Sequence, residues 1–423
     1  MRNFTFKGLF LTAVFMLLGC LSIQAANDDL ITKQITIKLD KAGTLPNKIA
    51  SSEMYKITNL KIIGEINGTD WNMIREMAGR NYQESSTEGN LSVLDLSEAR
   101  IVEGGDDYYY DNLFNNKVYT SNDEIGEYAF AYCRGLTSLT LPAGITSIGR
   151  SAFVGCSGLT SLTLPAGITS IDSYAFYSCS GLMSLTLPTG ITSIGEYAFD
   201  KCSGLTSLTL PAGITSISNG AFMGCSGLTS LTLHAGITSI GISAFAYCSG
   251  LTSLTLPAGI TSISNGAFKG CSGLTSLTLP ASITSIGDVA FSGCSGLTSL
   301  ILPASITSIG SYAFSSCSGL TSIYVYPDIV PKMGSDVFYD VDKKNCTLYV
   351  PQGTKQAYFL ADVWGNFENI VEYDPTGIDK TTTSSDVEEV SRYSVNGQRL
   401  VGPTKGLNIV KYSDGSVKKV AVE

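Results

Sequence analysis

Residues 148–170 read I-G-R-S-A-F-V-G-C-S-G-L-T-S-L-T-L-P-A-G-I-T-S, and this unit recurs almost unchanged through the middle of the chain. Cysteines mark the copies at intervals of 23 residues, the first at Cys133 and the ninth at Cys317. Tandem near-copies at one fixed period are typical of a solenoid, in which each unit forms one coil and buries its apolar side chains against its neighbours. The sequence therefore predicts a stack of coils rather than one globular core.

The unit also indicates how one coil is built. Apolar and hydroxyl side chains alternate along Ser138–Leu141, so we expect a short strand with leucines inward and hydroxyls outward. A Pro-Ala-Gly turn ends this strand, and Ile145–Ile148 forms a second extended segment. Ala152, Phe153 and Cys156 have the spacing of one face of a single helical turn. One coil buries too little to fold alone, so stacking into a parallel sheet is expected.

On this interpretation the chain has five segments. We expect a signal peptide over residues 1–25, an N-terminal cap with atypical repeats over 26–124 and the repeat solenoid over 125–325. A C-terminal cap over 326–374 and a polar linker with a small β module over 375–423 follow.

The expected export signal has two interpretations. The apolar run Leu9–Leu18 follows a short basic segment and is too short to cross a bilayer comfortably. Cleavage after Ala25 would release the protein, whereas Leu17–Cys20 resembles a bacterial lipobox, which would place a lipid anchor on Cys20. No later stretch reads as a transmembrane helix. We therefore expect an exported protein, at the outer surface or secreted.

The strand signature recurs on both flanks without the 23-residue spacing. It appears in residues 57–62 and 91–96 before the repeats, and in Leu348–Pro351 after them. Terminal repeats of a solenoid are atypical because one of their faces meets water. Trp364 and Phe367 are expected to close the apolar core at the C-terminal end.

These motifs resemble a known family. L-x-x-L-x-L-P, I-x-x-I and A-F-x-x-C are similar to the BspA-like class of leucine-rich repeats of bacterial surface proteins. The resemblance implies a leucine-rich-repeat solenoid with a parallel β-sheet face and short helical turns on the convex side. It also implies an adhesin-like role, with a host extracellular-matrix protein or a glycan as partner. G-L-N-I-V at 406–410 and K-K-V at 418–420 resemble sorting modules of Bacteroidetes outer-surface proteins, although a β module without a sorting role fits equally well.

Composition argues against several functions. The net charge is -9, which disfavours a nucleic-acid partner because such partners require basic stripes. His234 is the single histidine, so His-rich metal sites and Ser-His-Asp catalysis are not expected. No nucleophile elbow, phosphate-binding loop or zinc-protease motif is present. We therefore expect a monomeric binding protein without catalytic residues, metal or cofactor, and a structural spacer is the alternative.

Two sets of residues are candidates for binding. The first is the outward hydroxyl ladder, which could hold a repetitive ligand through many weak contacts or could simply be solvated. Its members are Ser138, Thr140, Ser161, Thr163, Ser207, Thr209, Ser253 and Thr255. The second set is Tyr108, Tyr109 and Tyr110 in an insertion rich in aspartate, which could form a sugar site or a calcium site but is expected to be a disordered surface loop.

Two further patterns accompany the repeats. Tyrosines occupy variable positions around A-F-x-x-C, where they either supply contact area or cover the convex turn; they are Tyr128, Tyr132, Tyr174, Tyr177, Tyr197, Tyr247 and Tyr312. The cysteines of stacked coils point the same way at about 4.8 Å, farther apart than a disulfide allows. We therefore expect buried free thiols.

Overall fold

The structure of the 423-residue chain is a computed structural model. It describes residues 29–111, 115–327, 329–373, 389–394, 399–400, 405–412 and 417–422. The expected signal peptide, its alternative lipid site at Cys20 and the expected linker at 375–388 lie outside the described residues.

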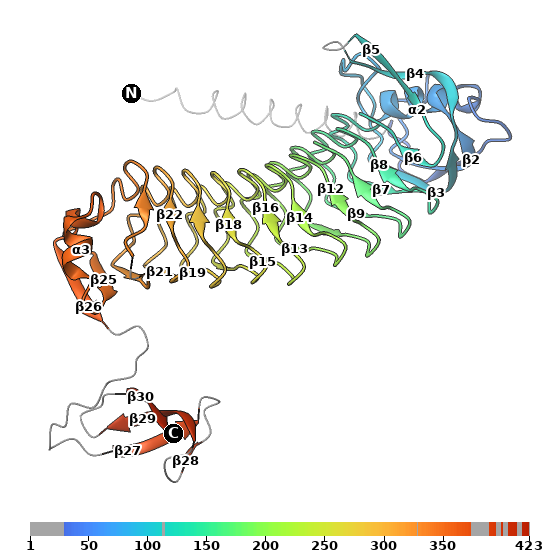
Figure 1. The fold of residues 1–423 in the computed structure, drawn as a ribbon. Coiled ribbons are helices and arrows are strands. Elements are labelled where there is room, and N and C mark those ends of the chain that lie inside the picture. Colours follow the sequence, from blue (N-terminus) through green and yellow to red (C-terminus); the bar gives the residue numbers. More distant parts are fainter. Residues whose placement is uncertain are drawn as a thin grey trace, which may run out of the picture.

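The repeats form a parallel solenoid, as the sequence predicts (Figure 1). In a typical coil the S-L-T segment is a three-residue strand that pairs in register with the same segment of the next coil, as β7 does with β9 and β9 with β11. The strands of this first ladder are β7 (Ser138–Thr140), β9 (Ser161–Thr163), β11 (Ser184–Thr186), β13 (Ser207–Thr209), β15 (Ser230–Thr232), β17 (Ser253–Thr255), β19 (Ser276–Thr278), β21 (Ser299–Leu302) and β23 (Ser322–Val325).

A second ladder runs beside the first. Each coil adds two residues to it, and most of these pair in parallel with the neighbouring coil. Its members are β6 (Glu124–Ile125), β8 (Ser147–Ile148), β10 (Ser170–Ile171), β12 (Ser193–Ile194), β14 (Ser216–Ile217), β16 (Ser239–Ile240), β18 (Ser262–Ile263), β20 (Ser285–Ile286), β22 (Ser308–Ile309) and β24 (Lys332–Met333). The pairing forms three runs: β6 to β12, β14 with β16, and β18 to β24.

The turn side of each coil takes the form of consecutive hydrogen-bonded turns in place of the expected helical turn. The amide of Cys156 donates to the carbonyl of Phe153, and the amide of Phe153 donates to the carbonyl of Ala175 in the next coil. Along this segment, one backbone amide closes a turn within its coil and the next bonds to the following coil, in alternation. This alternation satisfies the backbone without a helix.

Phenylalanine and cysteine form the core behind these turns. From Phe130 to Phe314 the rings stack with centroids 5.0 to 5.6 Å apart. The cysteines from 133 to 317 are buried and free, as predicted. From Cys156 onward each thiol lies 3.0 to 3.3 Å from the carbonyl oxygen of a phenylalanine in the preceding coil. The cysteines thus act as small apolar residues with a weak donor.

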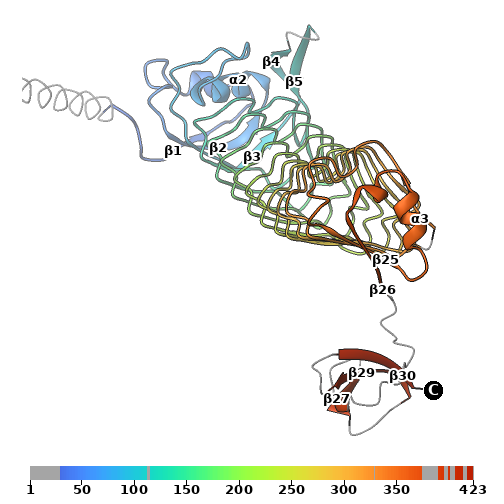
Figure 2. The same cartoon turned by 90° about the vertical axis from the view of Figure 1, so that its left-hand side faces the viewer.

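The N-terminal region extends the first ladder with β1 (Ile35–Lys38), β2 (Asn59–Ile66) and β3 (Val93–Ile101), which pairs with β7. Between them lie η1 (Leu45–Asn47) and α2 (Gly68–Met77). Asn67 and Asp70 form a capping box that starts α2. A hairpin of β4 (Gly104–Asp111) and β5 (Asn116–Thr120) packs against α2 (Figure 2).

At the other end, β25 (Thr347–Pro351) and β26 (Asn369–Tyr373) complete the first ladder. α3 (Lys355–Leu360) and η2 (Trp364–Asn366) lie between them. Trp364 and Phe367 are buried, with ring centroids 5.5 and 5.4 Å from that of Phe338. The Phe338 ring stacks on Phe314 with centroids 5.8 Å apart, so Trp364 and Phe367 cover the last ring of the phenylalanine stack.

A separate antiparallel sheet contains β27 (Glu389–Ser394), β28 (Arg399–Leu400), β29 (Gly406–Tyr412) and β30 (Val417–Val422). The strand order is β28-β27-β29-β30. Arg392 donates to Asn408 at 3.2 Å inside it.

Candidate functional site

The first ladder exposes two columns of hydroxyl groups, because leucine points inward at the middle of each strand and its two neighbours point outward. Serine pairs with serine and threonine with threonine between coils. We call this surface the hydroxyl face: Ser138, Thr140, Ser161, Thr163, Ser184, Thr186, Ser207, Thr209, Ser230, Thr232, Ser253, Thr255, Ser276 and Thr278. All eight Ser and Thr candidates from the sequence lie on it.

The hydroxyls of this face differ from the other hydroxyls of the repeat. Threonines at two other positions donate to a carbonyl of the preceding coil at 3.0 to 3.4 Å; they are Thr137, Thr146, Thr192, Thr206, Thr229, Thr238, Thr275, Thr284, Thr307 and Thr321. Within the described residues, the side chains of the hydroxyl face have no such partner in the protein. Their hydrogen-bonding capacity is therefore directed to the outside.

The threonine column changes character at its N-terminal end. Asp95 pairs with Thr140 in register, and Lys61 pairs with Asp95. Lys61 Nζ lies 3.3 Å from Asp95 and 2.7 Å from Glu98. Burial alone would raise the pKa of Asp95, but hydrogen bonds from Ser97 and the charge of Lys61 outweigh burial and lower it. The column therefore begins with charged groups.

The other end of the column is aromatic. Ile301, Tyr324 and Tyr349 continue it in register, and the two tyrosine rings are stacked at 4.4 Å. Tyr373 meets both rings edge-on at 5.6 and 6.1 Å. These tyrosines are not among the candidates predicted from the sequence, although the match of Leu348–Pro351 to the strand motif places Tyr349 in the threonine column.

The three tyrosines of the insertion occupy different environments. Tyr108 is buried and its hydroxyl donates to the carbonyl of Glu127 at 2.7 Å. Tyr109 is also buried and its hydroxyl bonds to the Glu84 carboxylate; burial and this carboxylate raise its pKa. Tyr110 is half-buried. The insertion is therefore a packed hairpin rather than a free surface loop.

The aspartates of the insertion are also dispersed. Asp106 accepts from Thr69, Asp107 from Lys117 and Asp111 from Tyr128. Across the described part of the chain, no three His, Cys, Asp or Glu side chains are grouped closely enough to hold a metal ion.

A groove lies between the hairpin and the second ladder. Its volume is about 860 Å³, and its lining includes Val118 and Tyr119 of β5 and the serines that begin β8 and β10. Glu124, Glu127, Asp172 and Glu196 make this lining acidic, with Lys117 as its cation.

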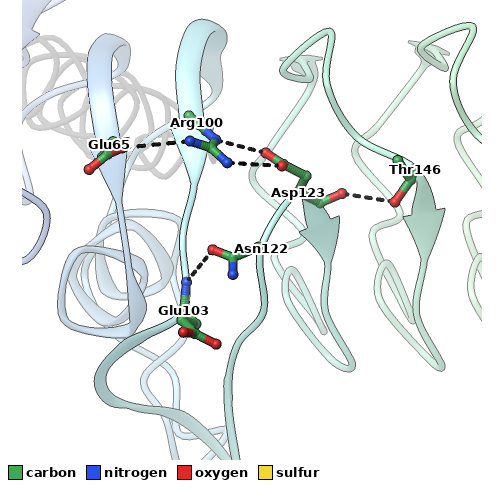
Figure 3. Close-up of polar contacts among 6 residues, drawn as sticks. All are labelled: Glu65, Arg100, Glu103, Asn122, Asp123 and Thr146. Atoms are coloured by element: carbon green, nitrogen blue, oxygen red, sulfur yellow. Dashed lines mark hydrogen bonds and ion pairs between the residues drawn. The ribbon is translucent and has the colours of Figure 1, made fainter.

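A polar seam joins the N-terminal region to the solenoid beside this groove (Figure 3). Arg100 of β3 donates to both carboxylate oxygens of Asp123 at 3.2 and 3.3 Å and lies 3.9 Å from Glu65. Thr146 donates to the carbonyl of Asp123 at 3.3 Å, and Asn122 accepts from the amide of Glu103 at 3.1 Å. These contacts fix the chain where the second ladder begins.

The fold and the repeat define a leucine-rich-repeat solenoid. The model of the BspA type leucine rich repeat region matches residues 123–252 and 238–356, which together span more than half of the sequence. The chain therefore belongs to the BspA-type leucine-rich-repeat family. No curated protein matches the sequence.

The chain is similar to several solved structures, and the first of them supports the same fold. A leucine-rich repeat protein from Bacteroides ovatus is 22% identical, with 80% of this chain and 84% of that chain covered and a TM-score of 0.53. A leucine rich repeat protein from T. pallidum is 29% identical over 42% of this chain and 72% of that one, with a TM-score of 0.32. A leucine rich cell surface protein from Faecalibacterium prausnitzii is 23% identical over 69% and 87%, with a TM-score of 0.37. Over the described residues, no helix has the length and apolar character needed to cross a membrane.

Proposed function

We propose that this protein is an exported, non-catalytic, adhesin-like surface protein whose hydroxyl face binds a repetitive partner. The observation that carries the proposal is the set of exposed, in-register hydroxyls without protein partners, beside threonines that are internally bonded. An extended protein of the extracellular matrix or a glycan would meet the same donor and acceptor pair once per coil.

Repetition supplies affinity that one coil cannot. Neighbouring strands in a sheet lie about 4.8 Å apart, so a ligand along the face contacts several coils at once. Each hydroxyl contact is weak because it replaces a hydrogen bond to water. Once one contact has formed, the others form at high effective concentration.

The ends of the chain fit a role at the cell surface. The expected signal peptide would direct export, with Cys20 as the alternative lipid site. The C-terminal sheet β27–β30 would act as the sorting or attachment module. We propose a monomer, because the exposed parts of the repeats then remain available to a partner.

The test is a binding screen of the full chain against matrix proteins, mucin and a glycan array. The partner is then titrated against the triple variant Thr186→Val, Thr209→Val and Thr232→Val. Valine keeps the branched shape and strand preference of threonine but removes the hydroxyl. We expect affinity to fall at least about tenfold, which corresponds to about 0.5 kcal/mol for each hydroxyl removed.

A matched control removes as many hydroxyls from the turn side. Ser180→Ala, Ser203→Ala and Ser226→Ala change exposed serines outside the hydroxyl face. Equal losses in both triple variants would contradict the hydroxyl face as the site. A folded chain that binds nothing in the screen would favour the alternative of a structural spacer.

A further inference from the structure

Two columns of the turn side hold residues in a left-handed backbone conformation. The first contains Tyr128, Ser151, Tyr174, Tyr197, Gly220, Ser243, Gly266, Val289 and Tyr312, with φ between 50° and 61°. The second contains Tyr132, Gly155, Ser178, Lys201, Gly224, Tyr247, Gly270, Gly293 and Ser316, with φ between 54° and 77°. Glycine adopts this conformation freely, whereas a side chain costs about 1–2 kcal/mol. Tyrosine therefore sits at these positions against backbone preference.

The tyrosines of these columns are concentrated in the coils nearest the hairpin. Tyr128, Tyr132, Tyr174 and Tyr197 belong to the first four coils, and glycine becomes more frequent in the coils that follow. Residues with a side chain occur in this conformation along the whole repeat, so it is the tyrosine rings, and not the backbone strain, that are concentrated at this end.

Tyr128, Tyr132 and Tyr174 line a pocket where β4 meets the first coils. Its volume is about 390 Å³, within the range of small-molecule sites. Its aromatic lining is Tyr109, Tyr128, Tyr132, Tyr174 and Tyr177. Tyr109 and Tyr128 are stacked at 4.2 Å, and Tyr174 and Tyr177 are tilted by 59° at 6.0 Å. Two aromatic pairs, one stacked and one tilted, therefore form the walls of one cavity.

The polar lining consists of Glu84, Asp111 and Arg150. The hydroxyl of Tyr109 bonds to Glu84, and that of Tyr128 donates to Asp111 at 3.2 Å. The walls are thus held by their own hydrogen bonds before any ligand enters. A preformed site loses less entropy on binding.

The charges around the pocket select the class of ligand. Arg75 lies 5.3 Å from the ring centroid of Tyr109, and Arg80 lies 5.9 Å from that of Tyr132. Neither arginine lines the pocket, but both place positive charge beside its tyrosine rings, which disfavours an organic cation there. Glu84 and Asp111 oppose an anionic ligand. An uncharged ligand with many hydroxyls and an apolar face remains.

We propose that this tyrosine pocket binds one ring of an uncharged sugar. The C–H face of the sugar packs on a tyrosine ring, whose face carries negative charge density. Its hydroxyls bond to Asp111, Glu84 and Arg150, which together offer acceptors and donors. The site lies on the turn side and does not depend on what the hydroxyl face binds.

The test is an array of neutral glycans probed with the full chain, followed by titration of the strongest binder. Two variants introduce residues that the chain already uses at the same backbone position, Tyr132→Gly and Tyr174→Ser. The fold should therefore survive, which thermal unfolding checks. We expect each variant to weaken glycan binding at least about tenfold, since each removes an aromatic wall.

Matched controls lie in the same columns, outside the pocket. Tyr247→Gly reproduces the first substitution, including a neighbouring cation, because Lys269 lies 5.8 Å from the Tyr247 ring. Tyr312→Ser reproduces the second. Binding should change less than about twofold in both. The proposal is overturned if no neutral glycan binds the full chain, if the controls lose binding equally, or if only hydroxyl-face variants lose it.

Discussion

At the scale of single residues, tyrosine and glycine are coupled between adjacent coils. A Cβ added to Gly270 would lie 2.6 Å from Cδ1 of Tyr247, and one added to Gly155 would lie 2.6 Å from Cδ1 of Tyr132. At Gly293, by contrast, the nearest atom to an added Cβ would be the Gly270 Cα at 3.5 Å, an ordinary contact. Glycine at 270 thus makes room for a ring as well as for the backbone.

This coupling makes a prediction about two alanine substitutions. Gly293→Ala should cost about 1 kcal/mol of unfolding free energy, from the left-handed backbone alone. Gly270→Ala should cost more, because the Tyr247 ring must also move. Denaturant unfolding measures both, and adding Tyr247→Gly should return the cost at 270 to that at 293. Equal costs in the two single variants would show that the ring yields freely.

Asp200 is the one carboxyl at a position that two other coils, at Ala131 and Ala246, fill with alanine. Its side chain is buried, and burial raises its pKa to about 6, although Lys201 acts in the opposite direction. The unfolded carboxyl has a pKa near 3.8. Between these values only the folded state keeps the proton, so this group lowers stability as pH rises through that window.

Asp200→Ala should therefore stabilise the protein at pH 7 by up to about 3 kcal/mol, the equivalent of a shift of about two pKa units. The gain should largely disappear at pH 3, below both pKa values, where the carboxyl is mostly protonated in both states. Thermal unfolding of both proteins across this range tests the prediction. The same difference at both pH values would mean that packing, and not ionisation, is responsible.

The sequence predicts which side chains of the repeat point inward and which point outward, but it does not predict which side chains of the insertion are buried. Alternation in the strand places Thr140 outward and Leu139 inward, as observed. From the sequence, Tyr108 and Tyr109 could not be distinguished from Tyr110 as binding candidates. Their burial results from the packing of β4 on α2, which are far apart in the chain. No local pattern in the sequence predicts this contact between β4 and α2.

At the scale of elements, α2 supplies the hydrogen-bond donors that a preceding coil would otherwise give to the first coil. In the solenoid, carbonyls on the turn side accept from amides of the preceding coil, as Ala152 does from Phe130. The first coil has no predecessor of this kind. Its Ala129 carbonyl instead accepts from Trp71 Nε1 at 2.8 Å and from Arg75 at 3.1 Å. The Tyr108 hydroxyl likewise donates to the Glu127 carbonyl.

Tyr108→Phe tests this replacement. The variant keeps the ring but leaves the Glu127 carbonyl without its donor, so it should lose about 1 kcal/mol of unfolding free energy. Tyr110→Phe is the control, because the Tyr110 hydroxyl bonds to the Asn115 side chain within the hairpin and not to a coil. If the two variants are equally stable, the cap does not depend on this donor.

The capping elements show where sequence reasoning reached its limit. Strand motifs at 57–62 and 91–96 match β2 and β3, because inward apolar spacing is a local property. The donor role of Trp71, Arg75 and Tyr108 depends on how α2 and β4 lie over the first coil. That arrangement is set by tertiary packing.

At the scale of the whole molecule, the coils are nearly identical, so the solenoid can be shortened without changing the chemistry of its surface. Stability of such a stack is a sum of coil and interface terms, so a coil can be removed without changing the rest. Because residue 228 of one coil corresponds to residue 205 of the previous one, deletion of residues 205–227 leaves the pattern continuous. Deletion of 205–250 removes two coils in the same way.

This deletion series tests whether the hydroxyl face binds its partner through repetition. Both deletions keep the caps, the hairpin and the tyrosine pocket. With folding checked by thermal unfolding, the affinity for the partner found in the screen is measured for the full chain and both deletions. Affinity should fall stepwise with each coil removed, because each coil contributes one set of contacts. Equal affinity in all three folded proteins would contradict binding through repetition.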